Sequence, residues 1–151
     1  MIHPAKFLFF PIFALSVLGC VPAKTNYAEE ATKRFNEDLA KHKASQTRMW
    51  EIEASILQRT ITENGEMPTI EKIKRDSIAN FKDPDSVLFK DLKLISFGDG
   101  KLLCGSLNAK NGFGAYVGYK QFLASTITMH LPRKDERFAI TTERMIRDIC
   151  I

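Results

Sequence analysis

The sequence is poor in the side chains that catalysis and nucleic-acid binding usually require. It has three histidines, of which His3 lies at the extreme N-terminus. The other two, His42 and His130, fall in different predicted elements, and neither has a cysteine, serine or carboxylate at a spacing typical of a catalytic site. Lys and Arg number 22 and Asp and Glu 18, but the charges are interspersed and form no long basic run. We therefore expect neither a catalytic histidine nor a nucleic-acid partner.

The glycine-rich and acidic stretches do not fit a cofactor or metal site either. Gly112-Phe113-Gly114 lacks the GxxxxGK[ST] frame of a phosphate-binding loop. Asp83 and Asp85 flank Pro84, and a turn after a helix explains them better than an acid pair. The cysteines have no histidine at ligand spacing. The sequence thus predicts no cofactor and no metal.

Long apolar runs are also missing, except at the N-terminus. Residues 7–18 are apolar apart from Pro11 and Ser16, and Lys6 is the one charged side chain before them. This run is shorter than the about 20 residues that a membrane-spanning helix needs. A basic start followed by a short apolar run is typical of a secretory signal.

The residues that end this run, Val17-Leu18-Gly19-Cys20, resemble the lipobox of bacterial lipoproteins. The resemblance implies that residues 1–19 are removed and that Cys20 receives a diacylglycerol on its thiol and an acyl chain on its new amine. Two or more acyl chains are enough for stable anchoring in a membrane. Because Val21 stands where aspartate would resemble an inner-membrane retention signal, we expect the outer membrane, on its periplasmic side or at the cell surface. An ordinary secretory signal with a chance cysteine is the alternative.

Cysteine is scarce, and its few positions are informative. If Cys20 carries lipid, Cys104 and Cys150 remain, in a compartment where disulfides form. We expect these two to be joined, and a free buried pair is the alternative. A bridge that closes so long a loop would stabilise the protein by about 4 kcal/mol on chain-entropy arguments.

The first half of the chain after the signal has the pattern of helices. Residues 20–26 form a short tether, and residues 27–62 contain neither proline nor glycine and place apolar residues at helical spacing. We expect one long helix, or two helices joined near residues 45–47. Its first half has few apolar residues and would form a stalk, and its second half, residues 49–61, is richer in them and would pack on the rest of the domain. Asn64-Gly65 indicates a turn. A second helix is predicted over residues 70–81, with Pro68 as a breaker and Thr69 as its N-cap.

The second half changes to the pattern of strands. We predict strands over residues 87–97, 101–109 and 115–124, a possible fourth over 126–131 and a short last one over 137–140. Thr141 or Thr142 would cap a final helix over residues 143–149. The order predicts an α+β fold: a long N-terminal helix, a second helix, a small antiparallel sheet of three to five strands and a short C-terminal helix. Residues 68–151 would form the α+β domain, in which one face of the sheet is buried against the second helix.

Two stretches also resemble a family of small uncharacterised bacterial lipoproteins and exported proteins. The first is Asp83-Pro84-Asp85-Ser86 with the aromatic strand start after it, and the second runs from Cys104-Gly105 to Gly118-Tyr119. They match a pattern of DP-x-S followed by CG-x-x-N-A-K-N-x-x-G-x-Y. The resemblance covers about residues 70–123 and implies no activity.

The segment inside this second stretch is the strongest candidate for a binding site. It groups amides, lysines and aromatic rings at one end of the predicted sheet, contributed by Asn108, Lys110, Asn111, Tyr116, Tyr119 and Lys120. Such a group could hold a glycan, a peptide or a loop of a partner. The alternative is structural: the asparagines would bond the turn backbone and the tyrosines would complete the core.

These observations favour a non-catalytic binding or structural protein of the bacterial envelope. It would be anchored in the membrane by acyl chains on Cys20 and contact another envelope protein or peptidoglycan. The alternative is a hydrolase that acts on envelope material. The absence of a nucleophile or acid–base pattern in the sequence favours the first function.

Overall fold

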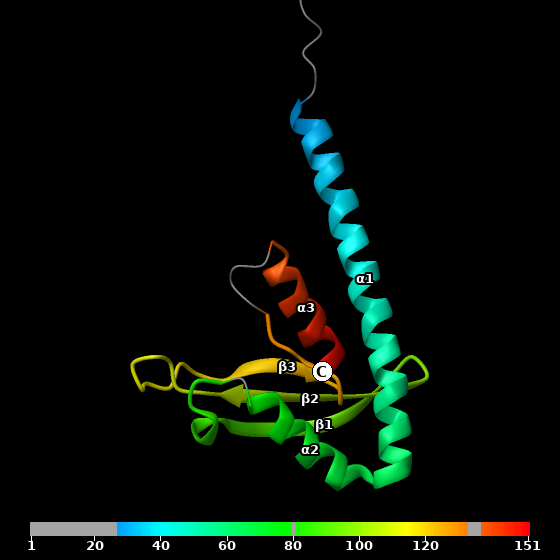
Figure 1. Ribbon diagram of the computed structural model, residues 1–151. Coiled ribbons are helices and arrows are strands. Elements are labelled where there is room, and N and C mark those ends of the chain that lie inside the picture. Colours follow the sequence, from blue (N-terminus) through cyan, green and yellow to red (C-terminus); the bar gives the residue numbers. More distant parts are fainter. Residues whose placement is uncertain (1–26, 80, 133–136) are drawn as a thin grey trace, which may run out of the picture.

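The computed structural model describes residues 27–79, 81–132 and 137–151. The predicted signal, the lipidation site Cys20 and the tether of residues 20–26 lie outside these residues. The described part confirms the predicted α+β fold, with three α-helices, a short 3₁₀ turn at Pro84–Ser86 and an antiparallel sheet of four strands (Figure 1).

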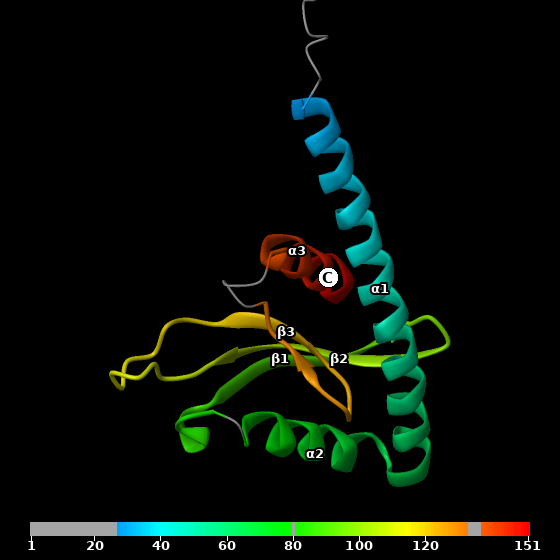
Figure 2. The same cartoon turned by 45° about the horizontal axis from the view of Figure 1, so that its top comes forward.

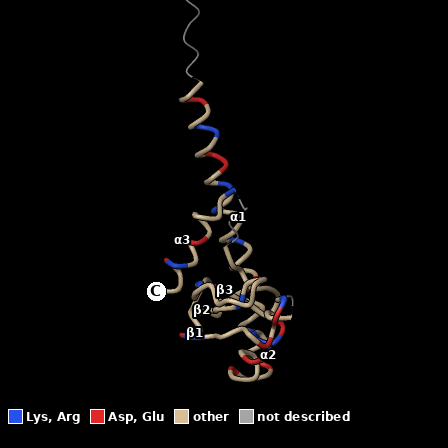
Figure 3. Tube along the Cα trace, turned by 90° about the vertical axis from the view of Figure 1, so that its left-hand side faces the viewer, with Lys and Arg blue, Asp and Glu red and all other residues tan. Residues whose placement is uncertain are grey.

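Helix α1, Tyr27–Asn64, is one continuous helix of 38 residues, so the expected alternative of a break near residues 45–47 is wrong. Residues 27–37 are all exposed, and acidic and basic side chains alternate along them (Figure 3). The buried residues follow further along the helix and recur every three to four positions, as one face of a helix must; they are Trp50, Glu53, Ala54 and Leu57. The start of α1 therefore stands clear of the sheet while its second half packs on it (Figure 1).

Helix α2, Glu66–Ile78, begins earlier than predicted and ends earlier. Gly65 alone separates it from α1, with a φ of 86° that favours glycine. Pro68 lies in the first turn, where its missing N–H costs no hydrogen bond, so it does not act as a breaker. The predicted N-cap role of Thr69 is also wrong. Thr69 is buried within the helix, and its hydroxyl donates to the Gly65 carbonyl over 2.7 Å.

The sheet has the strand order β1-β2-β3-β4, and each neighbouring pair is antiparallel. The strands are β1 (Leu88–Phe97), β2 (Gly100–Asn108), β3 (Lys120–Ala124) and β4 (Met129–His130). The two last strands are shorter than predicted. In β1 the register shifts between Lys90 and Lys93, where Asp91 has a φ of 55°. This bulge inserts an extra residue and explains why the alternation in the sequence starts afresh at Asp91.

Helix α3, Ala139–Cys150, replaces the short strand predicted over residues 137–140. A short apolar run such as Phe138-Ala139-Ile140 has no periodicity of its own, so its neighbours decide its structure. The Phe138 ring packs against the His42 ring of α1 at a centroid distance of 4.7 Å. Thr142 is therefore not a cap but a buried helical residue, whose hydroxyl lies 3.1 Å from His42 Nε2.

The predicted packing of one face of the sheet against the second helix is confirmed, and the other face is buried as well. Figure 2 shows the sheet between α2 on one side and α3 on the other. Alternate residues of β2 supply the two cores, because successive side chains point to opposite faces. One core contains Trp50, Ala54, Leu102, Cys104, Leu123 and Ile146, and the other contains Leu57, Ile73, Leu103, Leu107, Phe122 and Ala124.

Close backbone contact joins the β1–β2 hairpin to α1. A Cβ atom on Gly100 would lie 2.2 Å from the Ala54 carbonyl oxygen, so only glycine fits there. Since antiparallel strands place successive connections at opposite ends, the β2–β3 connection lies at the end of the sheet away from α1 (Figure 1). The fold thereby presents the predicted binding segment as a projecting loop.

Candidate functional site

The predicted binding segment forms an exposed loop between β2 and β3. Regular pairing of these strands ends at Leu107 and Lys120, and an isolated bridge joins Lys110 to Tyr116 beyond it. Every residue from 110 to 121 is exposed. The loop projects from the sheet on the side opposite α1 (Figure 1). A partner could therefore reach this whole stretch without displacing any part of the described fold.

Asn111 holds the tip of this loop in shape. Its Oδ1 accepts hydrogen bonds from the backbone N–H of Phe113 at 2.9 Å and of Ala115 at 3.1 Å. Its own N–H donates to the Ala115 carbonyl over 2.8 Å. Gly114 completes the turn with a φ of 83°. Asn111 therefore has the structural role that was predicted as the alternative to ligand binding, namely bonding the turn backbone, and it is exposed as well.

The turn presents Phe113, which is not among the six residues predicted from the sequence. Its side chain is 97% exposed, and Val117 is 57% exposed. An apolar side chain between two glycines in a hydrogen-bonded turn has no neighbouring side chain to pack against. The Gly-Phe-Gly pattern is therefore the sequence signal that could have identified Phe113. An exposed phenylalanine held in a fixed turn is suited to fill a pocket on a partner.

Tyr116 and Tyr119 lie on the surface rather than in the core, with 45% of each exposed. The ammonium of Lys90 lies 4.2 Å from the Tyr119 ring centroid, and that of Lys110 lies 5.6 Å from the Tyr116 ring. Lys110 also lies 3.9 Å from the Asp83 carboxylate. Each ring therefore lies within the about 6 Å over which an ammonium group and an aromatic ring attract one another. The two tyrosines thus form a preorganised aromatic surface below the tip.

The remaining predicted residues separate from this surface. Lys120 is exposed at the first position of β3. Asn108 is only partly exposed, and its buried Oδ1 has no partner among the described residues. Of the six predicted residues, therefore, Asn108 buries its amide oxygen, Asn111 shapes the turn, and Lys110 forms the accessible surface with the two tyrosines, while Lys120 lies exposed beside it.

A histidine–carboxylate pair that the sequence did not reveal lies in the core under β4. The Nε2 atom of His130 lies 2.9 Å and 3.1 Å from the two carboxylate oxygens of Glu53. Glu53 is only 4% exposed, and the His130 ring packs edge-on against Trp50 at 5.7 Å. The two residues are 77 positions apart in the chain, so no short sequence motif indicates that they pair. Its burial against Trp50 favours a structural role over contact with a substrate.

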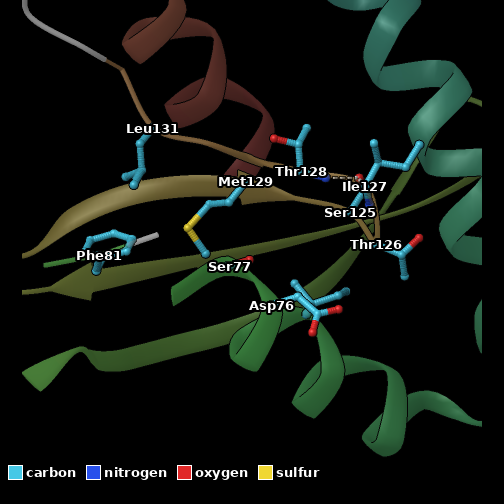
Figure 4. A pocket seen from close by; sticks show the side chains of 10 residues that line it. Asp76, Ser77, Phe81, Ser125, Thr126, Ile127, Thr128, Met129 and Leu131 are labelled. Carbon is cyan, nitrogen blue, oxygen red and sulfur yellow. Dashed lines mark hydrogen bonds between the residues drawn. The ribbon is translucent and has the colours of Figure 1, made fainter. Parts of the chain in front are cut away.

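A hollow of about 410 Å³ lies between α2 and the β3–β4 turn (Figure 4). Its walls include Ile73, Ser77, Phe81, Thr128, Met129 and Leu131. Asp76 lies at its edge. A hydrogen bond from Lys72 lowers the pKa of the Asp76 carboxyl, and the charges of Lys72 and Arg75 act in the same direction. The carboxylate at this edge of the hollow is therefore paired with the Lys72 ammonium.

Comparisons of the chain with protein-family models, with curated protein sequences and with solved structures find no match. Among the described residues, none of the helices has the length and apolar character needed to cross a membrane. The same residues contain no group of three or more His, Cys, Asp or Glu side chains placed to hold a metal ion.

Proposed function

We propose that this chain is a lipoprotein of a bacterial outer membrane, anchored through acyl chains on Cys20, that binds another envelope protein without catalysis. The observation that carries the binding function is the loop surface, by which we mean the exposed side chains of Lys110, Phe113, Tyr116, Val117 and Tyr119. Aromatic side chains, such as those at the tip and sides of this loop, are among the residue types that dominate protein–protein binding energy.

The proposed location is supported by the sequence of residues 1–20 and by the disulfide. Cys104 and Cys150 are joined, with their α-carbons 5.6 Å apart. Disulfides of this kind persist in exported proteins and are rare in the cytosol of most cells.

The shape of the described part is suited to reaching a partner away from a membrane. Helix α1 has 38 residues and a length of about 57 Å at 1.5 Å per residue. Its exposed start follows the segment that contains Cys20, and the sheet packs on its other half (Figure 1). An anchor before α1 would leave the loop surface free.

A hydrolase was the alternative, and the His130–Glu53 pair is the observation that bears on it. In a hydrolase, this histidine would activate a nucleophile or water at an open site. Here the carboxylate partner is buried and the ring is packed against Trp50. We therefore favour binding over hydrolysis.

The test is capture of partners from membranes by the lipidated protein after crosslinking. Phe113→Ser combined with Tyr116→Ser should reduce capture of the main partner at least about tenfold, because such aromatic anchors each contribute about 2 kcal/mol or more. The melting temperature should change little, since Phe113 is almost fully exposed and Tyr116 nearly half exposed.

Two controls make the result specific. Ile140→Ser removes an apolar side chain that is 77% exposed on α3, far along the chain from the loop, and should leave capture unchanged. Asn111→Asp keeps the side-chain oxygen that accepts the hydrogen bonds of the turn and should still capture the partner, whereas Asn111→Ala loses this oxygen and should capture less. Full capture by the Phe113→Ser, Tyr116→Ser protein would exclude the loop surface. If the Phe113→Ser, Tyr116→Ser protein instead loses binding to isolated peptidoglycan while capture of proteins is unchanged, the partner is the cell wall.

A further inference from the structure

Two adjoining hollows form a groove on the α2 side of the sheet. The first is the hollow of about 410 Å³ beside α2 (Figure 4), and the second, of about 330 Å³, lies at the base of the β2–β3 loop. They adjoin because Phe81 and Leu131 line both. Each volume falls within the about 300–1,000 Å³ that is typical of small-molecule sites. We call the two together the α2 groove.

The walls of the α2 groove are mainly apolar along its length. Met129 and Ile73 contribute on the α2 side, Phe81 and Leu131 lie in the middle, and Leu107 lies at the loop end. Apart from Ile73 and Leu107, which are buried, these side chains are partly buried and border open space. A hydrocarbon chain laid against them would remove apolar surface from water on both partners.

The two ends of the α2 groove differ in charge. Lys110 and Lys120 line the loop end, and Asp76 lies at the other. Lys120, Phe122 and Ala124 are alternate residues of β3 and so share one face of the strand. Phe122 and Ala124 pack in the core on the α2 side, so Lys120 lies on that side as well. Among the described residues no carboxylate pairs with Lys120, and Lys110 has one at 3.9 Å. The loop end therefore offers two ammonium groups to an anion, whereas at the opposite end the charged groups are already paired, since Asp76 bonds Lys72.

We propose that the α2 groove binds a single-chain anionic amphiphile, such as a fatty acid. The acyl chain lies along Phe81 and Leu131, and the anionic head lies between the ammonium groups of Lys110 and Lys120, directed away from Asp76. The groove shares Lys110 and Val117 with the loop surface, but Phe113 and Tyr116 do not line it, so substitutions at those two residues test the loop surface separately.

The test uses the full chain in phosphatidylcholine nanodiscs, labelled on its methionine methyl groups and titrated with octanoate. Met129 lines the groove, whereas Met49 and Met145 pack in the core on the other side of the sheet. The Met129 methyl signal should shift saturably, and the signals of Met49 and Met145 should stay in place. A Met129→Leu variant assigns the signal.

The head group is tested by charge. In the Lys110→Ala, Lys120→Ala protein the apparent affinity for octanoate should fall about tenfold, because each partly exposed charge contact contributes modestly. Octanol, which has the same chain and no charge, should bind both proteins equally. The matched double variant Lys41→Ala, Lys43→Ala on α1 should bind octanoate as the unaltered protein does, and so should Phe113→Ser.

Three outcomes would overturn the proposal. One is the absence of a saturable Met129 shift with octanoate. Another is an equal shift of all the methionine signals, which would indicate general partitioning into protein and lipid. The last is an octanoate affinity that the two lysine substitutions leave unchanged. Loss of partner capture with Phe113→Ser, but unchanged octanoate binding, separates this site from the loop surface.

Discussion

At the scale of single residues, the buried pair of Glu53 and His130 separates a structural role from a catalytic one. The Glu53 side chain is 5% exposed and the His130 side chain 14%. A carboxylate in such a place depends on its hydrogen-bond partner, because water cannot replace it. A catalytic pair would instead lose activity on mutation and keep much of its stability.

His130→Ala should lower the free energy of unfolding by about 3 kcal/mol, the lower end for breaking a buried pair, since it leaves the Glu53 carboxylate without its partner. The double variant Glu53→Leu, His130→Phe should recover much of this loss, because it removes both polar groups together. Urea unfolding followed by Trp50 fluorescence measures both. A loss below about 1 kcal/mol for His130→Ala would show that water satisfies Glu53 after all, and would reopen the hydrolase alternative.

At the scale of elements, α3 is attached to the fold at three places. Ile146 is buried in the core shared with Trp50, and Phe138 packs against both Phe35 and His42 of α1. The disulfide then joins the last residue of the helix, Cys150, to Cys104 in β2. Noncovalent contacts at Ile146 and around Phe138, and one covalent link at Cys150, therefore hold α3.

Cys104→Ala combined with Cys150→Ala should lower the free energy of unfolding by about 4 kcal/mol, because the 46-position loop is then unconstrained in the unfolded chain. Trypsin should cut at Arg144 and Arg147 much sooner, since α3 can detach. Reducing agent should have the same effect on the unaltered protein and none on the variant. Equal resistance to trypsin in both proteins would mean that apolar packing alone holds α3.

At the scale of the whole molecule, the described fold is a sheet covered on both faces, with the start of α1 projecting from it (Figure 2). The loop surface and the start of α1 lie at separate ends of this arrangement (Figure 1). A tether before α1 would allow the covered sheet to move relative to a membrane while its loop stays accessible.

Cys20→Ala should leave an uncleaved precursor or release the protein from the membrane, because the thiol that takes the lipid is gone. Cell fractionation and the mass of the intact protein measure the change. The Cys104→Ala, Cys150→Ala protein serves as the control and should still be lipidated. Membrane-bound Cys20→Ala protein with the lipid mass still present would exclude lipidation at this cysteine.

The elements themselves follow from local sequence. Residues 27–64 contain neither proline nor glycine and repeat apolar residues at helical spacing, so a helix is expected there in any context. The Gly98-Asp99 turn joins β1 to β2 because glycine accepts the positive φ of 54° that the turn needs. The pairing of Cys104 with Cys150 was predictable by counting cysteines. These signals act over a few residues or depend on number alone.

Which residues meet depends on how the elements pack. Ala139 and Ile140 became the start of α3 because Phe138, just before them, packs on α1, and Thr69 lies inside α2 because Gly65 ends α1. The pairing of Glu53 with His130 and the α2 groove join elements that are far apart in the chain. Such contacts depend on how faces of helices and strands pack, and periodicity shows that a face is apolar without showing what covers it. For this reason the sequence determined the elements, the α+β order and the exposed glycine-rich turn, while packing determined the second buried face of the sheet and the groove beside α2.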